Sequence, residues 1–230
     1  ADHFDIEKFD ADFAYTMDGD TEGEIQYENF NAADAIFEIQ GVNVHPGSAK
    51  DVMVNAALVA MEINAALPCG ETPADTEDYE GFYHLVSMSG DVACAKLHYI
   101  VRDHDADKFA ARLETLKEIS KQMNLKWGFG TVKLTIDEQY RNMAEIIEDG
   151  NMHLIENAKK ACAAADVTPL ILPIRGGTDG ARLSFMGLPC PNLGTGGHGY
   201  HGPFEHITAE GMDKAVDVMI ELVKLYAEMK

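Results

Sequence analysis

The segment 173–205 concentrates the residue types that could do chemistry. It contains Arg175 in the sequence R-G-G-T-D-G, followed by a glycine-rich stretch with His198, His201 and Glu205. Glycines at this density let the backbone approach a ligand closely and adopt positive φ angles. Guanidinium groups pair with carboxylates, and imidazole and carboxylate groups bind metals. The segment therefore predicts a ligand site rather than a packing element.

Each of these candidates also has a plain structural interpretation. His201 is then a histidine in a flexible turn, and Arg175 caps or pairs within the core. His198, His201 and His206 could alternatively form a local metal site, but their spacings of three and five residues match no defined metal motif. The glycines beside Arg175 favour a backbone that faces a ligand.

A second segment, residues 11–30, reads as two short strands and contains Asp18 in the sequence Y-T-M-D-G. Asp-Gly is a strong signal for a β-hairpin, so Asp18 and Gly19 are predicted to lie between the two strands. On the residues alone, Asp18 is most simply a turn residue.

The composition is that of an ordinary soluble globular protein, with 46% hydrophobic and 25% charged residues in a chain of 230. A formal net charge of −21 argues against nucleic acid or an anionic membrane as a partner, because phosphate binding needs Lys and Arg. The four cysteines form no C-x-x-C pair, so we expect free thiols in a reducing cytoplasm. No apolar run reaches the roughly 18 residues of a membrane span.

Residues 33–137 predict an α+β unit that can fold alone. Ser48 is expected to cap its first helix, because serine is a favoured N-cap residue. The expected elements are strand 35–41, helix 49–67, strands 82–89 and 92–102, helix 106–123 and strand 128–136. This β-α-β-β-α-β order is that of a ferredoxin-like sandwich, with two helices on one face of an antiparallel sheet.

The rest of the chain predicts one layered α/β domain, formed by residues 1–32 and 138–230, into which residues 33–137 are inserted. The apolar run 169–174 is typical of a buried parallel strand, and the helices carry apolar stripes. The expected elements are helices 140–149 and 152–165, strand 169–174, helix 179–186, strand 190–193 and helix 209–229.

Several longer motifs follow one another in a familiar order. They are A-Y-T-M-D-G, E-N-F-N-A-A, N-V-H-P-G-S-A-K, Y-E-G-F-Y-H-L, H-Y-I-V-R-D-H-D, R-G-G-T-D-G-A-R-L-S-F-M-G-L-P-C-P-N-L and T-G-G-x-x-Y-H-G-x-x-E. Over essentially the whole chain they resemble the tripeptide aminopeptidases of the M20 family of di-zinc metallopeptidases. The resemblance implies a zinc-peptidase α/β domain with an inserted lid domain. It also implies release of the N-terminal residue of tripeptides by zinc-activated water.

The resemblance implies a role for individual residues. Asp18 resembles a carboxylate ligand of one zinc, and His201 resembles an imidazole ligand of the other. Arg175 resembles the residue that binds the substrate carboxylate, while His45 and Arg102 resemble lid groups that close over the substrate. A lid histidine such as His45 could donate to the oxyanion of a tetrahedral intermediate. Without the resemblance, His45 is a turn residue and Arg102 a charge at a strand end.

The chain also departs from the family pattern. The family's metal-binding His-x-Asp motif, metal-bridging aspartate and Glu-Glu pair, which lie upstream of the Tyr-Thr-x-Asp segment, are not matched in this sequence, where the spacing His-x-Asp occurs only at His3–Asp5. The sequence P-F-E-H at 203–206 stands where Lys-His-Glu-Phe is expected, and His198 stands where an aromatic residue is expected. These smaller departures put in doubt which neighbours orient His201.

We therefore expect this chain to supply one ligand for each of two zinc ions and to lack the general base. A catalytic zinc normally needs three protein ligands, so the chain alone is predicted to be inactive. Its expected partners are small peptides, and its expected location is the cytoplasm. The alternative hypothesis is a non-catalytic fragment that serves only for binding or association, through the lid or an exposed sheet edge.

Overall fold

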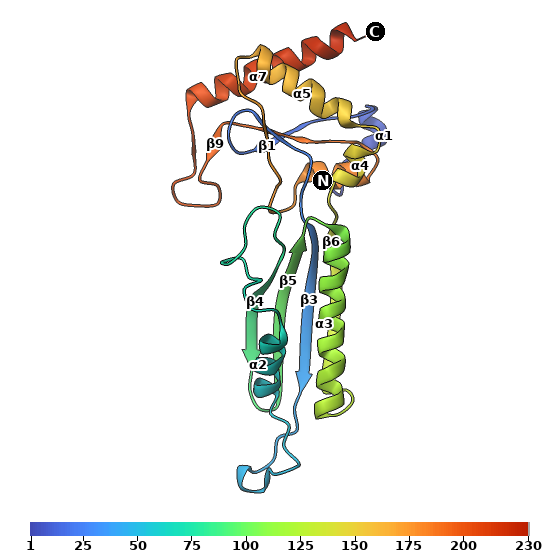
Figure 1. Ribbon diagram of the computed structural model, residues 1–230, viewed down its shortest axis with the longest axis vertical. Helices are drawn as coiled ribbons and strands as arrows, with labels where there is room; N and C mark the ends of the chain where they lie inside the picture. Colours follow the sequence, from blue (N-terminus) through green and yellow to red (C-terminus); the bar gives the residue numbers. More distant parts are fainter. Residues whose placement is uncertain (230) are drawn as a thin grey trace. The chain divides into compact units, whose positions relative to one another are not determined.

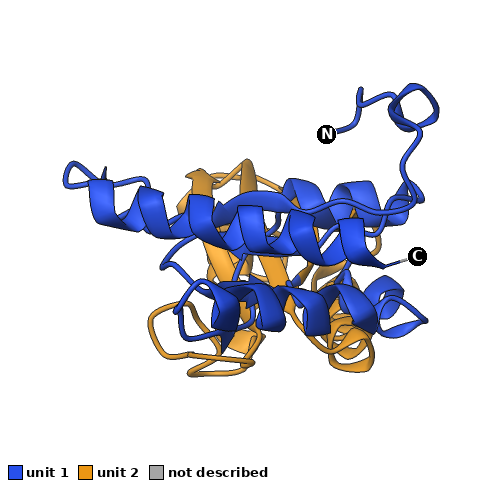
Figure 2. Ribbon diagram, turned by 90° about the horizontal axis from the view of Figure 1, so that it is seen from above, with its two compact units in different colours: residues 1–30, 141–230 blue, residues 31–140 orange. Residues whose placement is uncertain are grey.

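The computed structural model describes residues 1–229, and the chain forms two units within it (Figure 2). Unit 1 combines Ala1–Phe30 with Arg141–Lys230, and unit 2 is Asn31–Tyr140. Unit 2 is thus inserted in the sequence of unit 1. The catalytic and lid roles assigned to the two parts stay predictions.

Unit 2 is built on a four-stranded antiparallel sheet in the order β4-β5-β3-β6 (Figure 1). Its elements are β3 (Asn31–Gln40), the 3₁₀ helix η1 (Pro46–Ser48), α2 (Ala56–Ala66), β4 (Phe82–Gly90), β5 (Cys94–Asp103), α3 (Ala106–Trp127) and β6 (Val132–Tyr140). The predicted order of strands and helices is confirmed, and this strand order is that of a ferredoxin-like sandwich.

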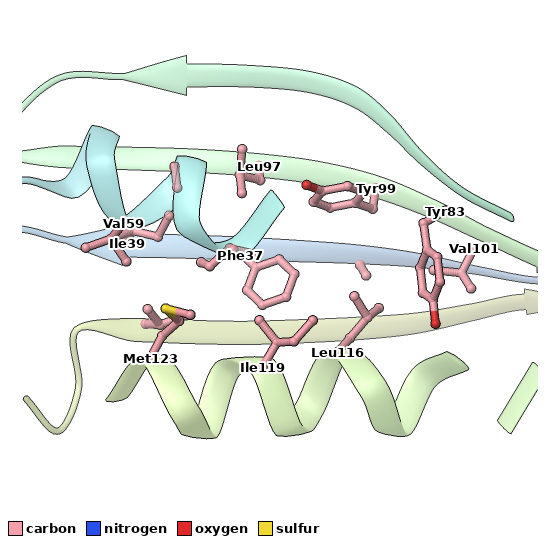
Figure 3. Close-up of a cluster of buried hydrophobic side chains, with 14 of the residues drawn as sticks. Phe37, Ile39, Val59, Tyr83, Leu97, Tyr99, Val101, Leu116, Ile119 and Met123 are labelled. Atoms are coloured by element: carbon pink, nitrogen blue, oxygen red, sulfur yellow. The ribbon is translucent and has the colours of Figure 1, made fainter. Parts of the chain in front are cut away.

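Both helices of unit 2 cover the same face of its sheet and share one apolar core with it (Figure 3). Phe37 of β3 and Tyr99 of β5 are fully buried, and their rings meet edge to face with centroids 6.2 Å apart. Ile63 of α2 and Leu116 of α3 are also fully buried in this core. Alternate residues of β3 are buried because successive side chains of a strand point to opposite faces.

The first helix of unit 2 begins later than the sequence predicts. Asn55 caps α2, since its Oδ1 accepts hydrogen bonds from the N–H groups two and three residues further on, at 3.1 and 3.3 Å. Ser48 instead ends the short helix η1, so its predicted capping role was wrong. Asp51 has a φ of 61°, which a right-handed helix cannot accommodate, and this interrupts the helical path before α2.

Unit 1 contains a second four-stranded sheet, in the order β1-β8-β2-β7. The elements of unit 1 are α1 (Ile6–Phe9), β1 (Thr16–Gly19), β2 (Glu24–Gln26), α4 (Ala144–Glu148), α5 (Met152–Ala164), β7 (Leu170–Ile171), α6 (Asp179–Phe185), β8 (Asn192–Gly194), β9 (Gly197–His198), β10 (His206–Ile207) and α7 (Ala209–Glu228). β1 is parallel to β8, and β2 is parallel to β7, whereas β2 and β8 are antiparallel.

The apolar core of unit 1 joins this sheet to helices α5 and α7, which pack against each other (Figure 1). Ile25 of β2 and Leu193 of β8 point into it, together with Leu154 of α5 and Leu222 of α7. The predicted helices over α5, α6 and α7 are confirmed, because their apolar stripes face this core.

One strand prediction for unit 1 was wrong, and a second is confirmed only in part. Asp18 and Gly19 lie inside β1 rather than in a turn, and β8 lies between β1 and β2, which therefore form no hairpin. β8 takes this place because Leu193 pairs with residues of both strands and fills the core between them. The run 169–174 is a parallel strand only over β7, whose side chains are exposed because β7 is an edge strand among the described residues.

Candidate functional site

Asp18 lies near the carboxyl end of β1, where the strand is irregular. Met17 pairs with Leu193 and Gly19 pairs with Gly194, so the register shifts at Asp18. Bulges of this kind re-aim a side chain and often occur beside sites. The side chain of Asp18 is exposed as a result, and its carboxylate is presented at this edge of the sheet.

The glycine-rich loop after β8 is tied to the same edge by the backbone of β1. The carbonyl oxygen of Asp20 accepts hydrogen bonds from the three successive N–H groups of residues 195–197, at 3.2, 2.8 and 3.1 Å. The hydroxyl of Tyr200 donates to the carbonyl oxygen of Gly19 at 3.2 Å and shares a hydrogen bond of 2.6 Å with the hydroxyl of Thr195. These contacts fix the loop against the end of β1.

The end of β8 also needs a glycine at this point. A Cβ atom on Gly194 would lie 1.9 Å from the carbonyl oxygen of Thr21, which is far closer than van der Waals contact allows. The turn after β1 and the end of β8 can therefore approach this closely only with glycine at position 194.

His201 follows Tyr200 directly and is exposed, with a left-handed φ of 61°. Its N–H donates to Oε2 of Glu205 at 2.9 Å, which closes the tip of the loop. Because β1 and β8 are parallel, their carboxyl ends meet at one edge of the sheet. The structure thus brings together the two segments that carry the predicted metal ligands, Asp18 and His201.

A buried glutamate, Glu24, lies beside this edge and was missed by the sequence analysis. It begins β2 and is 6% exposed. Its Oε2 accepts hydrogen bonds from the N–H of Asp20 and from Nε2 of Gln26, both at 3.0 Å. Burial raises the pKa of Glu24 above its usual range, and the hydrogen bond from Asp20 acts in the opposite direction. A charged residue directly before the apolar Ile25, within a predicted strand, was the one signal that the sequence offered.

Side-chain hydrogen bonds continue from Glu24 across the sheet. Oε1 of Gln26 accepts from Nδ2 of Asn192 at 3.2 Å. Oδ1 of Asn192 accepts from the hydroxyl of Thr178 at 3.2 Å and also from the hydroxyl of Thr16. Thr178 belongs to the sequence R-G-G-T-D-G and caps α6. A chain of buried and half-buried polar side chains therefore connects that sequence with the end of β1.

Arg175 lies at the other edge of the same sheet. It follows β7, which runs antiparallel to β1 and β8 because it is parallel to β2. Its guanidinium carbon is 5.1 Å from the centroid of the Phe30 ring, and the N–H of Phe30 donates to the carbonyl oxygen of Gly176 at 3.3 Å. The strand directions therefore do not bring Arg175 to the edge where Asp18 and His201 lie.

Arg102 and His45 lie at opposite ends of the sheet of unit 2. Arg102 pairs with Ala32 at the start of β3, and its guanidinium carbon is 5.3 Å from the centroid of the Tyr140 ring. His45 follows the other end of β3, where its Nδ1 accepts a hydrogen bond from the N–H of Gly47 at 3.1 Å. β3 has 10 residues, so about 30 Å of strand separates the two. Unit 2 of one chain cannot bring both side chains to one point.

Asp18 and His201 are donors of the type that zinc takes, but they are few. Within residues 1–229, no group of three or more His, Cys, Asp or Glu side chains is arranged to hold a metal ion. His198 and His206 face each other across β9 and β10, with ring centroids 5.5 Å apart. The described residues thus fit zinc in kind, yet offer fewer than the three protein ligands of a catalytic site.

The chain resembles known proteins in both sequence and fold. A family model described as a peptidase dimerisation domain of the M20 type matches residues 27–128. Peptidase T of Clostridium novyi is 53% identical over 99% of this chain, and peptidase T of Clostridium perfringens is 54% identical over the same share. Both matches cover 56% of the relative.

Three solved structures extend the comparison. Aminopeptidase PepT from Bacillus cereus has a TM-score of 0.85 at 23% identity and covers 99% of this chain and 60% of its own. A tripeptidase from Staphylococcus aureus has a TM-score of 0.84 at 18% identity, covering 98% and 60%. YxeP of Bacillus subtilis, described as a dinuclear metal binding peptidase from the M20 family, has a TM-score of 0.67 at 14% identity, covering 95% and 57%.

These likenesses define the fold as that of the M20 peptidases, with the dimerisation domain as the inserted part. The chain is homologous to the C-terminal part of peptidase T. It spans about half the length of the curated relatives that it matches, 56% in each case. None of the helices formed by residues 1–229 has the length and apolar character that a membrane crossing requires.

Proposed function

We propose that this chain is the C-terminal part of a cytoplasmic tripeptide aminopeptidase and supplies one ligand to each of two zinc ions. The observation that carries the proposal is the meeting of two segments at one sheet edge. Asp20 and Tyr200 tie the end of β1 to the loop after β8, so Asp18 and His201 lie on neighbouring, fixed segments. The homology of the chain to peptidase T is the reason for interpreting that edge as a metal site.

In this proposal each remaining candidate binds substrate. Arg175 pairs with the carboxylate of a small peptide, because a guanidinium binds a carboxylate through two parallel hydrogen bonds, and Arg102 closes over the substrate. The carboxylate of an extended tripeptide lies up to about 10 Å from its N-terminal residue, so Arg175 is proposed to bind it from the end of the sheet away from Asp18 and His201. His45 donates a hydrogen bond to the oxyanion that forms during hydrolysis. Zinc, when bound, would activate a water molecule for attack on the peptide bond. The general base is supplied by residues that this chain does not contain.

Self-association is part of the same proposal. His45 and Arg102 are separated by about 30 Å of strand, so they can meet one substrate only if a second copy supplies one of them. The match of residues 27–128 to a dimerisation domain supports such a pair of copies. The edge strand β4, with Val86 and Met88 about half exposed, offers a surface for it.

The test measures tripeptide hydrolysis and zinc content for this chain alone and together with the amino-terminal part of the Clostridium perfringens peptidase T. We expect hydrolysis and zinc only in the combination. Asp18→Ala and His201→Ala should each lower kcat/KM by about a hundredfold or more, since even residues that only orient metal ligands cost 10–100-fold. The exposed His3→Ala is the matched control and should leave kcat/KM unchanged. Full activity of His201→Ala would overturn the proposal.

A second candidate function is a non-catalytic association module. It is favoured by the absence, within residues 1–229, of a complete group of metal-binding side chains. It is also favoured by the exposed apolar residues Met212, Val216 and Ile220, which follow one another at helical spacing on α7. Stable self-association of the chain, with neither zinc nor hydrolysis in the combination above, would favour this function over the first.

A further inference from the structure

The backbone of Asp20 is the point at which β1, β2 and the loop after β8 meet. Its carbonyl oxygen accepts hydrogen bonds from residues 195–197, at 2.8 Å for Gly196. Its N–H donates to Oε2 of Glu24 at 3.0 Å. The backbone of Asp20 thus connects the glutamate of β2 with the loop that leads to His201, through the N–H of one peptide group and the carbonyl oxygen of the next.

Glu24 is the group best placed to hold this point of the backbone still. Its side chain is almost fully buried and is held in turn by Gln26, whose Nε2 donates to the same oxygen at 3.0 Å. Gln26 is itself held by Asn192 of β8. A buried side chain whose acceptor oxygen is held in a network of this kind is a rigid acceptor, since each partner is fixed by the next.

The position of Asp20 in the chain explains why this contact affects both candidate ligands. Asp20 follows Asp18 by two residues, directly after the bulge that exposes the Asp18 carboxylate. On its other side it anchors the loop whose tip carries His201. Any movement of the backbone at Asp20 therefore shifts both candidate ligands together.

We propose that Glu24 is a positioning residue that fixes Asp18 and His201 relative to each other by holding the backbone of Asp20. This inference rests on the proposed function for its catalytic meaning. Glu24 itself binds neither metal nor substrate. What it supplies is an acceptor at the correct distance from the Asp20 N–H, and its negative charge is not required for that.

Substitutions that change the length or the acceptor group of the side chain at position 24 test this proposal. In Glu24→Gln the amide oxygen can take over both hydrogen bonds, because both go to one oxygen of Glu24. In Glu24→Leu no acceptor is present. Glu24→Asp keeps the charge but is shorter by one methylene group and cannot reach Asp20, so it remains informative if the leucine variant fails to fold.

The first measurement is amide hydrogen exchange of the 230-residue chain, read at Gly196 and Gly197. We expect exchange at both amides to rise about tenfold or more in Glu24→Leu and Glu24→Asp, and to stay near wild type in Glu24→Gln. Glu22→Leu is the matched control, since it lies in the same turn and the structure of residues 1–229 shows no hydrogen bond or ion pair of its side chain. Amides of unit 2 should not change in any variant.

The second measurement is Zn²⁺ affinity in the combination with the amino-terminal part of the Clostridium perfringens relative. We expect it to fall about tenfold or more in Glu24→Asp and to be rescued in Glu24→Gln. Unchanged exchange at Gly196 in the aspartate and leucine variants would overturn the inference. Loss of protection throughout unit 1, including α5 and α7, in both variants would overturn it as well, since Glu24 would then be a general core residue. The local exchange effect without any Zn²⁺ binding by the wild type would overturn the proposed function and leave Glu24 as the residue that positions this edge.

Discussion

The two units of this chain hold their functional candidates in different ways. In unit 2 the strands have 9 or 10 residues and form long antiparallel ladders, two of them with one register shift each, over a single apolar core. In unit 1 the strands have only 2 to 4 residues. There, the segments are held together mainly by hydrogen bonds of loops and of the side chains of Glu24, Gln26 and Asn192, rather than by long ladders.

This difference indicates which parts of the two units are expected to open first. Long ladders lose many hydrogen bonds at once, so unit 2 should unfold as a whole. A loop anchored by a few bonds can open locally at much lower cost, and sites that must admit a ligand are commonly drawn from such regions. The edge that carries Asp18 and His201 is therefore expected to be less protected than the core of unit 2.

The largest effect is expected from a substitution in the core of unit 2. Phe37→Ala removes a fully buried ring and should lower the free energy of unfolding of unit 2 by about 3–5 kcal/mol. The single tryptophan, Trp127, ends α3 in unit 2, so its fluorescence during urea unfolding reports this unit alone. Phe129→Ala is the matched control, because that ring is fully exposed and its loss should change little. An equal loss in both variants would contradict the assigned core.

The thiols offer a comparison of both units in one experiment. Cys69 and Cys94 of unit 2 are exposed, whereas Cys162 and Cys190 of unit 1 are buried. At neutral pH a thiol reagent should therefore label two cysteines at once and two slowly, at the rate at which unit 1 opens. Immediate labelling of all four would show that the core of unit 1 is not closed as described.

The pH dependence of stability follows from the same thiols. Burial raises the pKa of Cys190 to about 11, so the folded state keeps a proton that the unfolded chain loses above about 8.5. The unfolded state binds fewer protons in this range, so the free energy of unfolding should fall as the pH rises, by about 2–3 kcal/mol at pH 10.5. Cys190→Ala should remove that part of the decline, while Cys69→Ala should retain it.

The smallest expected effect concerns a helix cap in unit 2. Asn55→Ala should lower the free energy of unfolding by about 1 kcal/mol, because Oδ1 of Asn55 accepts from the first N–H groups of α2. Ser48→Ala should have no comparable effect, since Ser48 ends η1 and does not cap α2. Urea unfolding followed by the fluorescence of Trp127 measures both. A larger loss for Ser48→Ala would restore the cap predicted from sequence.

Much of the fold could be predicted from local patterns. The alternation of β3 and the apolar stripes of α3, α5 and α7 identify their elements because a single face of each is buried. The hairpin at Asp18 could not be rejected in the same way. Asp-Gly has the same local preference whether or not a distant strand such as β8 inserts beside it.

Local sequence patterns were enough to predict the order of elements in unit 2 and the residue types available at the candidate site. Arg175 and His201 stood out because they lie in a glycine-rich segment, whereas Asp18 became a candidate only through the family resemblance. Only the tertiary structure decided which of them meet. The parallel pairing of β1 with β8 joins the segments of Asp18 and His201, while the reversed direction of β7 leads Arg175 to the other edge.

The role of Glu24 could be recognised only from the tertiary structure. Its neighbours Asp20 and Gln26 are close in sequence, but the burial that makes its carboxylate a fixed acceptor comes from β8 and the loop after it. Contacts between residues so far apart depend on the direction and register of short strands. Local preference does not encode these, because a strand of three residues pairs equally well in many registers until a shared core selects one.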